Sequence, residues 1–365
     1  MKIREITSLL ETIAPLSLQE DYDNAGLITG DQNTEINAAL ISLDCTEPVI
    51  DEAIAKGCGL IISHHPIIFR GLKKLNGKNY VERVIIKAIQ NNIALYAIHT
   101  NLDNIIGGVN SKIAEKIGLE NSTILSPKQG ILKKLVTFCP VSHAEKVRNA
   151  LFSSGAGEIG NYSECSYNTE GFGTFKAGEN THAYVGEKGL RHHEPEIRIE
   201  AIYPAYLERA ILVALHETHP YEEVAYDLYP LTNTFFHVGS GIIGSLNQGI
   251  SETEFLRVVK EKLGVKVIRH TRLREKTVKR VAICGGSGSF LLNHAINAGA
   301  DVFITADFKY HEFFDADGKI IIADVGHFES EQFTQELLLE IIRKKIPNFA
   351  LHLTEQNTNP INYFI

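Results

Sequence analysis

Five side chains of metal-binding type follow apolar segments at widely separated points of the chain. His64 and His65 end the run GLIISHHP, and Asp103 ends the run IALYAIHTNLD. His327 and Glu331 stand four residues apart in GHFESEQF, where a long amphipathic helix is expected to begin. An i,i+4 spacing puts both side chains on one helical face, with Cβ atoms about 5–6 Å apart. The spacing therefore predicts a metal-binding pair at the start of this helix.

Three imidazoles and two carboxylates suit borderline divalent ions, zinc first and then manganese, iron or cobalt. Five ligands are too many for one catalytic zinc, but they suit two ions that share a bridging carboxylate. Within a strand His64 and His65 would point to opposite faces, whereas at its end they can turn toward two neighbouring ions. Singly, each residue also has a structural explanation, such as a helix N-cap for Asp103. Their joint occurrence after predicted strands favours two ions per chain.

The elements that must position these residues alternate between strand and helix. This alternation predicts a largely parallel sheet, and ligands of such sheets gather at the carboxyl ends of the strands. In the first third we expect strands over residues 36–45, 59–66 and 93–103, and helices over residues 46–57, 81–92 and 108–119. Toward the C-terminus we expect strands over residues 278–286, 301–308 and 319–328.

Chain length and a change in the order of the predicted strands and helices predict three domains. The 365 residues exceed what one hydrophobic core usually supports. Between about residues 127 and 235 the order becomes strand, helix, a Gly/Asn/Ser/Tyr-rich loop, strand, helix and strand, which predicts an α+β unit like a ferredoxin-like domain. We therefore expect a first α/β lobe over residues 1–126, an inserted domain over residues 127–235 and a second α/β lobe over residues 236–365.

Composition narrows the class of protein. Five scattered cysteines without a C-x-x-C pair indicate reduced thiols in a cytosolic, cytoplasmic protein. No apolar run has membrane-spanning length, and the N-terminus lacks a signal-peptide core. The net charge of −8 argues against broad nonspecific nucleic-acid binding, which depends on phosphate neutralisation.

Several runs resemble a known family. DYDNAGLITGD, SHHPIIF, HTNLDN, CGGSGS, TADFKYHE and GHFESE are similar, in this order, to GTP cyclohydrolase I type-two homologues, also called Nif-three-like proteins. The resemblance implies a two-lobed, three-layer α/β core with a dinuclear metal centre in the cleft between the lobes. Carried over by position, His64 and His327 would hold one ion, His65 and Asp103 the other, and Glu331 would bridge both.

The insert has a resemblance of its own. THPYEEVAYDLYPL and GAGEIGNYSECSYNTEGFGTF resemble the extra domain of longer bacterial members, which is similar to CutA and PII-type trimerising domains. The resemblance implies a homo-oligomer, typically a toroidal homohexamer.

The loop TADFKYHE supplies further candidate catalytic residues. Lys309 is a candidate for binding an anionic substrate, and His311 for donating or accepting a proton near neutral pH. Ion pairing with Asp307 or Glu312 is the structural alternative. Family position puts this loop, with Asp307, at the cleft.

Three further features have weaker support. Asp23, Asn24 and His99 are candidates for orienting the metal ligands or for forming a turn. CGGSGS is either a tight strand-to-helix turn or a phosphate contact. His192 and His193, in RHHEPE, indicate an exposed hairpin tip because no apolar strand leads into them.

Together these features predict a metal-dependent hydrolase. The family resemblance implies ring opening of a small nucleotide, like that of a GTP cyclohydrolase, and the ligand set is equally compatible with hydrolysis of a phosphoester. The alternative is a non-enzymatic, ring-shaped protein that binds metal in a regulatory or interaction role.

Overall fold

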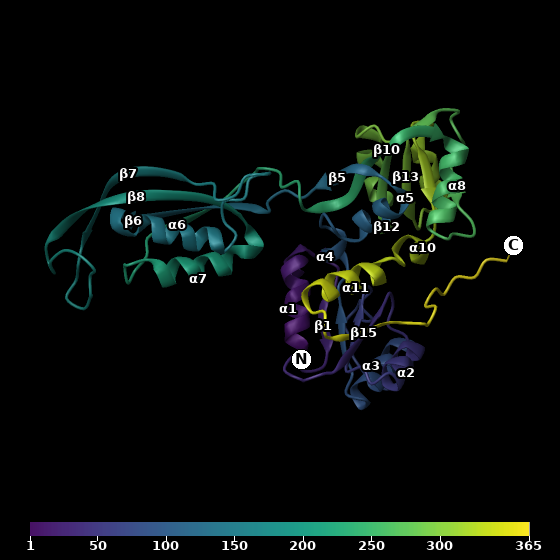
Figure 1. Ribbon diagram of the computed structural model, residues 1–365, viewed down its shortest axis with the longest axis horizontal. Helices are drawn as coiled ribbons and strands as arrows, with labels where there is room; N and C mark the ends of the chain where they lie inside the picture. Colours follow the sequence, from purple (N-terminus) through teal and green to yellow (C-terminus); the bar gives the residue numbers. More distant parts are fainter. Residues whose placement is uncertain (365) are drawn as a thin grey trace. The chain divides into compact units, whose positions relative to one another are not determined.

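The computed structural model describes residues 1–364 and divides into two compact units (Figure 1). The larger unit comprises Met1–Pro127 and Phe236–Ile365, and the smaller one is Lys128–Phe235. Within residues 1–364, no helix has the length and apolar character needed to cross a membrane.

The first sheet of the larger unit has the strand order β1–β4–β3–β2–β15, with β1 antiparallel to β4 and the other strands parallel. All residues of β2, β3 and β4 are buried, as expected for parallel strands that helices cover on both faces. The strands are β1 (Gly26–Thr29), β2 (Ala38–Ser42), β3 (Leu60–Ser63), β4 (Ala94–Ala97) and β15 (Ala350–Leu353).

Helices lie on both faces of this sheet. On one face α2 and α3 form an apolar cluster with Leu40, Ile61 and Leu95 of the strands. On the other face α11 packs on β2 and β15, and α1 packs against α11 (Figure 1). This lobe therefore has three layers. The helices are α1 (Ile3–Ile13), α2 (Glu47–Ala55), α3 (Tyr80–Gln90) and α11 (Thr334–Lys345).

The second sheet has the order β11–β14–β13–β12–β10–β5, and its central strands β12, β13 and β14 are parallel. Helix α9 packs on one face of this sheet, around Phe303 and Ile322. Helices α5, α8 and α10 also contact β12. The strands are β5 (Glu120–Pro127), β10 (Gly239–Ser251), β11 (Arg269–His270), β12 (Thr277–Ser287), β13 (Val302–Ala306) and β14 (Ile321–Asp324). The helices are α4 (Thr100–Asp103), α5 (Val109–Ile117), α8 (Glu252–Lys262), α9 (Leu292–Asn297) and α10 (His327–Glu331).

The two sheets exchange strands across the boundaries expected from the sequence. Strand β5, expected in the first lobe, pairs with β10 of the second sheet, and β15, expected in the second lobe, pairs with β2 of the first. Neither segment was predicted as a strand, and strand pairing depends on the path of the whole chain, which local hydrophobic patterning does not give. The long helix expected from residue 327 is also two helices, since α10 ends at Glu331 and α11 begins at Thr334.

The smaller unit is a four-stranded antiparallel sheet of order β7–β8–β6–β9. Helices α6 and α7 cover one face, where Leu135, Leu151, Ile199 and Leu215 belong to one buried cluster. The chain order β6–α6–β7–β8–α7–β9 gives the predicted ferredoxin-like topology. The likeness to CutA and PII-type domains stays a prediction. The elements are β6 (Leu132–Pro140), α6 (Ala144–Ser153), β7 (Tyr167–Lys176), β8 (Arg191–Pro204), α7 (Glu208–Thr218) and β9 (Tyr226–Pro230).

Part of the expected loop in the insert is a strand. Residues 167–176 form the edge strand β7, whose residues are mostly exposed, so no alternation of apolar and polar residues marks it. The prediction of a hairpin tip at His192 and His193 was also wrong, because both residues lie in β8, opposite Phe175 and Thr174 of β7.

Candidate metal centre

Strands from both sheets of the larger unit direct their carboxyl ends to one cleft of about 450 Å³. Parallel strands within a sheet bring side chains that follow them to the same edge. From the first sheet come Asp44 after β2, His64 and His65 after β3, and His99 and Asp103 after β4, and from the second come Asp307 after β13 and His327 and Glu331 after β14.

The Glu331 carboxylate, only 3% exposed, is the common point of the cluster. Its Oε2 atom lies 2.9 Å from His65 Nε2 and 3.1 Å from His327 Nε2, and these two nitrogens are 3.3 Å apart. Two ligands of one tetrahedral ion, each bound at about 2.0–2.1 Å, lie about 3.3 Å apart. The three atoms therefore have the separations expected for ligands of a single ion.

A second group shares Glu331 with the first. His64 Nε2 is 3.6 Å from Asp103 Oδ1 and 3.9 Å from Glu331 Oε2. Both His64 Nε2 and Asp103 Oδ1 are buried without a hydrogen-bond partner in the described part of the chain. A buried polar atom left unsatisfied costs about 1–3 kcal/mol, and a cation between these two atoms would satisfy both.

The grouping differs from the one that family position implied. That expectation paired His64 with His327 and His65 with Asp103, whereas the structure places His65 beside His327 and His64 beside Asp103. Glu331 belongs to both groups in either arrangement. The rotation of two adjacent side chains at the end of β3 decides the pairing.

Each imidazole of the two groups is held by a hydrogen bond at Nδ1. An oxygen acceptor there favours a proton on Nδ1 and leaves the Nε2 lone pair facing the cleft, as a metal ligand requires. The pairs are His64 with the Ile98 carbonyl oxygen at 2.8 Å, His65 with Asp44 Oδ1 at 2.7 Å, and His327 with Asp307 Oδ2 at 2.7 Å.

Burial and mutual contacts shift the pKa values of the clustered side chains in different directions, and burial lowers the pKa of His64. Burial and the nearby Glu331 raise the pKa of Asp103 well above its usual range. Burial disfavours charge on Glu331 too, but His327, His64 and His65 hold its pKa well below the usual range. Burial also opposes charge on His65 and His327, yet their carboxylate partners raise the pKa of His65 to about 9 and that of His327 to about 11. A divalent ion would take over this positive charge and displace the Nε2 protons, while the protons on Nδ1 stay in place.

The CGGSGS run closes tightly over Glu331. Gly286 has a φ of +61°, and a Cβ there would lie 2.3 Å from Glu331 Oε1 and 3.2 Å from His327 Cε1. The Gly286 amide also donates a hydrogen bond to Ser330 Oγ at 2.9 Å. The lack of a side chain at Gly286 thus makes room for two of the candidate ligands, and a phosphate contact by this run stays a prediction.

His99 lines the cleft beside the two groups. Its Nδ1 bonds Asp23 Oδ1 at 2.7 Å. One ring nitrogen from each of His64, His65 and His99 lies within 4.8 Å of the other two. Burial opposes charge on Asp23, but hydrogen bonds from His99 and Thr100 lower its pKa to about 2. Asp23 is therefore a fixed anion that orients His99, whereas Asn24 donates to the Ile68 carbonyl oxygen away from the ligands.

The loop predicted to be catalytic does not place all three of its candidate residues at the cleft. Asp307, with a left-handed φ of 58°, contacts His327. Lys309 and His311 are exposed, and neither lines the cleft. His311 instead stacks near the ring of Phe314, with ring centroids 6.4 Å apart.

The sequence reasoning missed Asp44, which holds His65. A signal existed, because Asp44 ends the apolar run ALISLD as Asp103 ends IALYAIHTNLD. Thr358 donates to the other oxygen of Asp44 at 2.6 Å, and no local pattern predicts this contact from the C-terminal segment.

A family model and curated relatives match nearly the whole chain. The family model Duf34/NIF3 (NGG1p interacting factor 3) matches residues 1–360. A Halalkalibacterium halodurans protein named GTP cyclohydrolase 1 type 2 homolog is 39% identical over 364 residues, covering 98% of each chain. A Bacillus subtilis protein of the same name is 37% identical, covering 99% of this chain and 98% of the relative.

Solved structures of related proteins also match over the whole chain. A crystal structure of a Bacillus cereus protein related to NIF3 matches with a TM-score of 0.87 and 41% identity, covering 100% of this chain and 99% of the other. A Staphylococcus aureus protein matches with a TM-score of 0.78 and 31% identity over the same shares.

Proposed function

The chain belongs to the DUF34/NIF3 family, and from this premise we propose that its cleft binds two divalent metal ions and acts as a hydrolase. The observation that carries the proposal is the shared Glu331 carboxylate, which belongs to two separate groups of ligand atoms. His65 and His327 would hold one ion, His64 and Asp103 the other, and Glu331 would bridge them. Zinc suits this donor set best, with manganese, iron and cobalt as alternatives.

The residues of the chain fit such a pair of ions. Two of the donor atoms, His64 Nε2 and Asp103 Oδ1, are buried and otherwise unpartnered, and hydrogen bonds at Nδ1 orient all three imidazoles. Five protein ligands also leave positions for water and substrate, unlike a structural zinc site closed by four ligands.

When bound, two bridged ions would polarise the electrophilic centre of a substrate and activate water at neutral pH. Asp44 and Asp307 would keep His65 and His327 in place. His99, held by Asp23, would accept or donate a proton at Nε2. Tyr22, Phe69 and Phe290, which line the cleft, would offer a substrate apolar surface to pack against.

The names of the relatives suggest hydrolysis of a nucleotide ring, and the ligand set suits phosphoester hydrolysis equally well. Incubation of the metal-loaded protein with GTP and with simple phosphomonoesters and phosphodiesters separates these reactions. Loss of the purine absorbance reports ring opening, with release of formate if the resulting formamide is hydrolysed as well, and release of phosphate or alcohol reports phosphoester hydrolysis. Bound metal without turnover on either set would support the non-enzymatic, regulatory alternative.

The metal proposal is tested by elemental analysis of full-length protein purified without added metal. We expect about two ions per chain in the wild type and loss of both in Glu331→Gln, because a bridge serves both ions. Glu261→Gln, the same change at an exposed position of α8, is the control and should keep both ions. Loss of only one ion in Glu331→Gln would contradict the bridging role.

Assembly into a toroidal homohexamer is part of the proposal through the family resemblance alone. Light scattering after size-exclusion chromatography would measure it, and a monomer at micromolar concentration would contradict it.

A further inference from the structure

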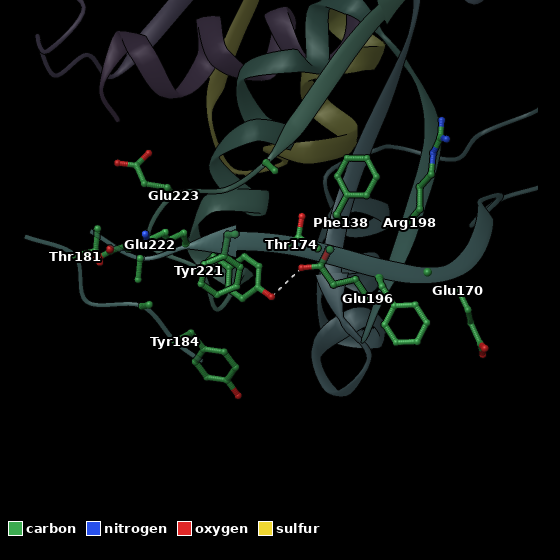
Figure 2. A pocket seen from close by; sticks show the side chains of 18 of the residues that line it. Phe138, Glu170, Thr174, Thr181, Tyr184, Glu196, Arg198, Tyr221, Glu222 and Glu223 are labelled. Atoms are coloured by element: carbon green, nitrogen blue, oxygen red, sulfur yellow. Dashed lines mark hydrogen bonds between the residues drawn. The ribbon is translucent and has the colours of Figure 1, made fainter. Parts of the chain in front are cut away.

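The insert contains a second cavity, of about 590 Å³, that the metal chemistry does not use (Figure 2). Along β8, Ile197 and Ile199 pack toward the helices of the insert, so Glu196 and Arg198, which line the cavity, face the opposite side of the sheet. Phe138 of the neighbouring strand β6 and Tyr221 of the segment before β9 also line it.

A buried carboxylate lies in this cavity. Glu196 is 9% exposed, and its Oε1 accepts a hydrogen bond from the Tyr221 hydroxyl at 2.8 Å (Figure 2). Burial and this contact raise the pKa of Tyr221, so the hydroxyl stays a donor. Glu196 Oε2 has no hydrogen bond or ion pair with any residue of the range 1–364, and the nearby Arg198 is paired with Glu200 at 2.9 Å. Carboxylates in largely buried positions are normally paired with a cation. Among residues 1–364 no cationic side chain contacts Glu196, and its Oε2 is accessible from the cavity.

Backbone and aromatic groups shape the space in front of this carboxylate. A Cβ at Gly173 would lie 2.1 Å from Glu196 Oε2, so the glycine leaves room for the carboxylate. The Tyr221 ring centroid is 6.2 Å from that of Phe175 and 6.3 Å from that of Tyr184. The faces of such rings carry negative potential and attract cations.

The remaining charges at the cavity agree in sign. Glu170, Glu222 and Glu223 are exposed at its rim, and Lys176 is the only cationic lining residue besides the paired Arg198 in the described chain. The surplus of carboxylates disfavours an anion. One buried carboxylate without imidazole or thiolate is also too few donors for a metal ion.

We propose that this cavity binds an organic cation, a primary ammonium or guanidinium group carried on an apolar body. The charged group would bond Glu196 Oε2, and the apolar body would pack among Phe175, Tyr184 and Tyr221. The proposal is independent of the metal centre.

The test is calorimetric titration of the full-length protein with 2-phenylethylammonium, with 2-phenylethanol as an uncharged probe of nearly equal shape. A charge-assisted hydrogen bond predicts that the ammonium binds about tenfold or more tighter than the alcohol. Glu196→Gln should remove this preference while leaving the alcohol unaffected. Glu145→Gln, the same change on the exposed side of α6, should bind as the wild type does.

Gly173→Ala is a second variant that retains all charges. Its Cβ would displace the Glu196 carboxylate and should weaken ammonium binding as well, so the test survives if Glu196→Gln fails to fold. Equal affinity for ammonium and alcohol, no binding at millimolar concentration, or wild-type binding by Glu196→Gln would each overturn the proposal. Absence of binding together with a changed oligomeric mass in Glu196→Gln would assign this face to contact between copies of the chain, and would overturn it too.

Discussion

Replacement of Gly286 by alanine tests whether the exact position of the Glu331 carboxylate, the candidate bridge, controls metal affinity. The substitution changes no charge and removes no ligand. A residue with a Cβ at the left-handed φ of +61° costs about 1–2 kcal/mol of stability. The new Cβ would also lie 2.3 Å from Glu331 Oε1, whereas Cβ atoms essentially never come within 3.0 Å of such a neighbour. The carboxylate must therefore move by several tenths of an ångström. Displacement of supporting groups typically lowers metal affinity about 10–100-fold, and we expect a loss in this range for both ions.

Gly118→Ala is the matched control. Gly118 also has a left-handed φ, of +78°, but a Cβ there meets no atom within 4 Å. Both variants should lose the stability that a left-handed φ costs, and Gly286→Ala should lose more in thermal denaturation of the metal-free protein because of its contact with Glu331. Only Gly286→Ala should lose metal in competition with a chelator. Wild-type metal affinity in Gly286→Ala, or equal losses in the two variants, would refute the inference that close packing of Gly286 positions Glu331.

Two further predictions concern single contacts. Asp44→Asn should lower metal affinity about 10–100-fold, because the amide holds Nδ1 of His65 more weakly and without charge, and unchanged chelator competition would contradict this. Burial lowers the pKa of His219 below its ordinary value of 6.5, while its Nε2 donates to the Phe138 carbonyl oxygen at 2.9 Å. The unfolded chain then takes up the proton first, so the contribution of His219 to stability is present above about pH 6.5 and is lost as the pH falls below it. His219→Gln should therefore reduce the fall in melting temperature between about pH 7 and about pH 5, and an unchanged fall would refute this assignment.

Much of the fold could be read from hydrophobic patterning. Continuous apolar runs such as LIIS and VFITA predicted buried parallel strands, and both runs are buried strands. The exposed strand β7 was missed because most of its residues are exposed, so that no buried apolar face marks it in the sequence. Strands β5 and β15 were not predicted, and they pair with β10 and β2, which lie far from them in the chain.

At the candidate site, residue types and their positions after strands predicted which side chains meet. The structure brings His64, His65, Asp103, His327 and Glu331 within one cluster. The sequence could not predict the pairing of His65 with His327, because that depends on side-chain rotation and on how the two sheets face each other. It also could not place Lys309 and His311 outside the cleft, since the path of a loop is decided by packing.

The sequence by itself determined the chemical types in the cluster, because types and strand-end positions are local properties of the chain. Only the tertiary structure decided which atoms share Glu331, which acceptors hold each imidazole, and that Gly286 leaves room for the carboxylate. The tertiary structure alone also shows that Glu196 is buried without a cationic partner, because no neighbouring residue in the chain indicates this. These properties depend on distances of tenths of an ångström between residues far apart in sequence, and such distances arise only from packing.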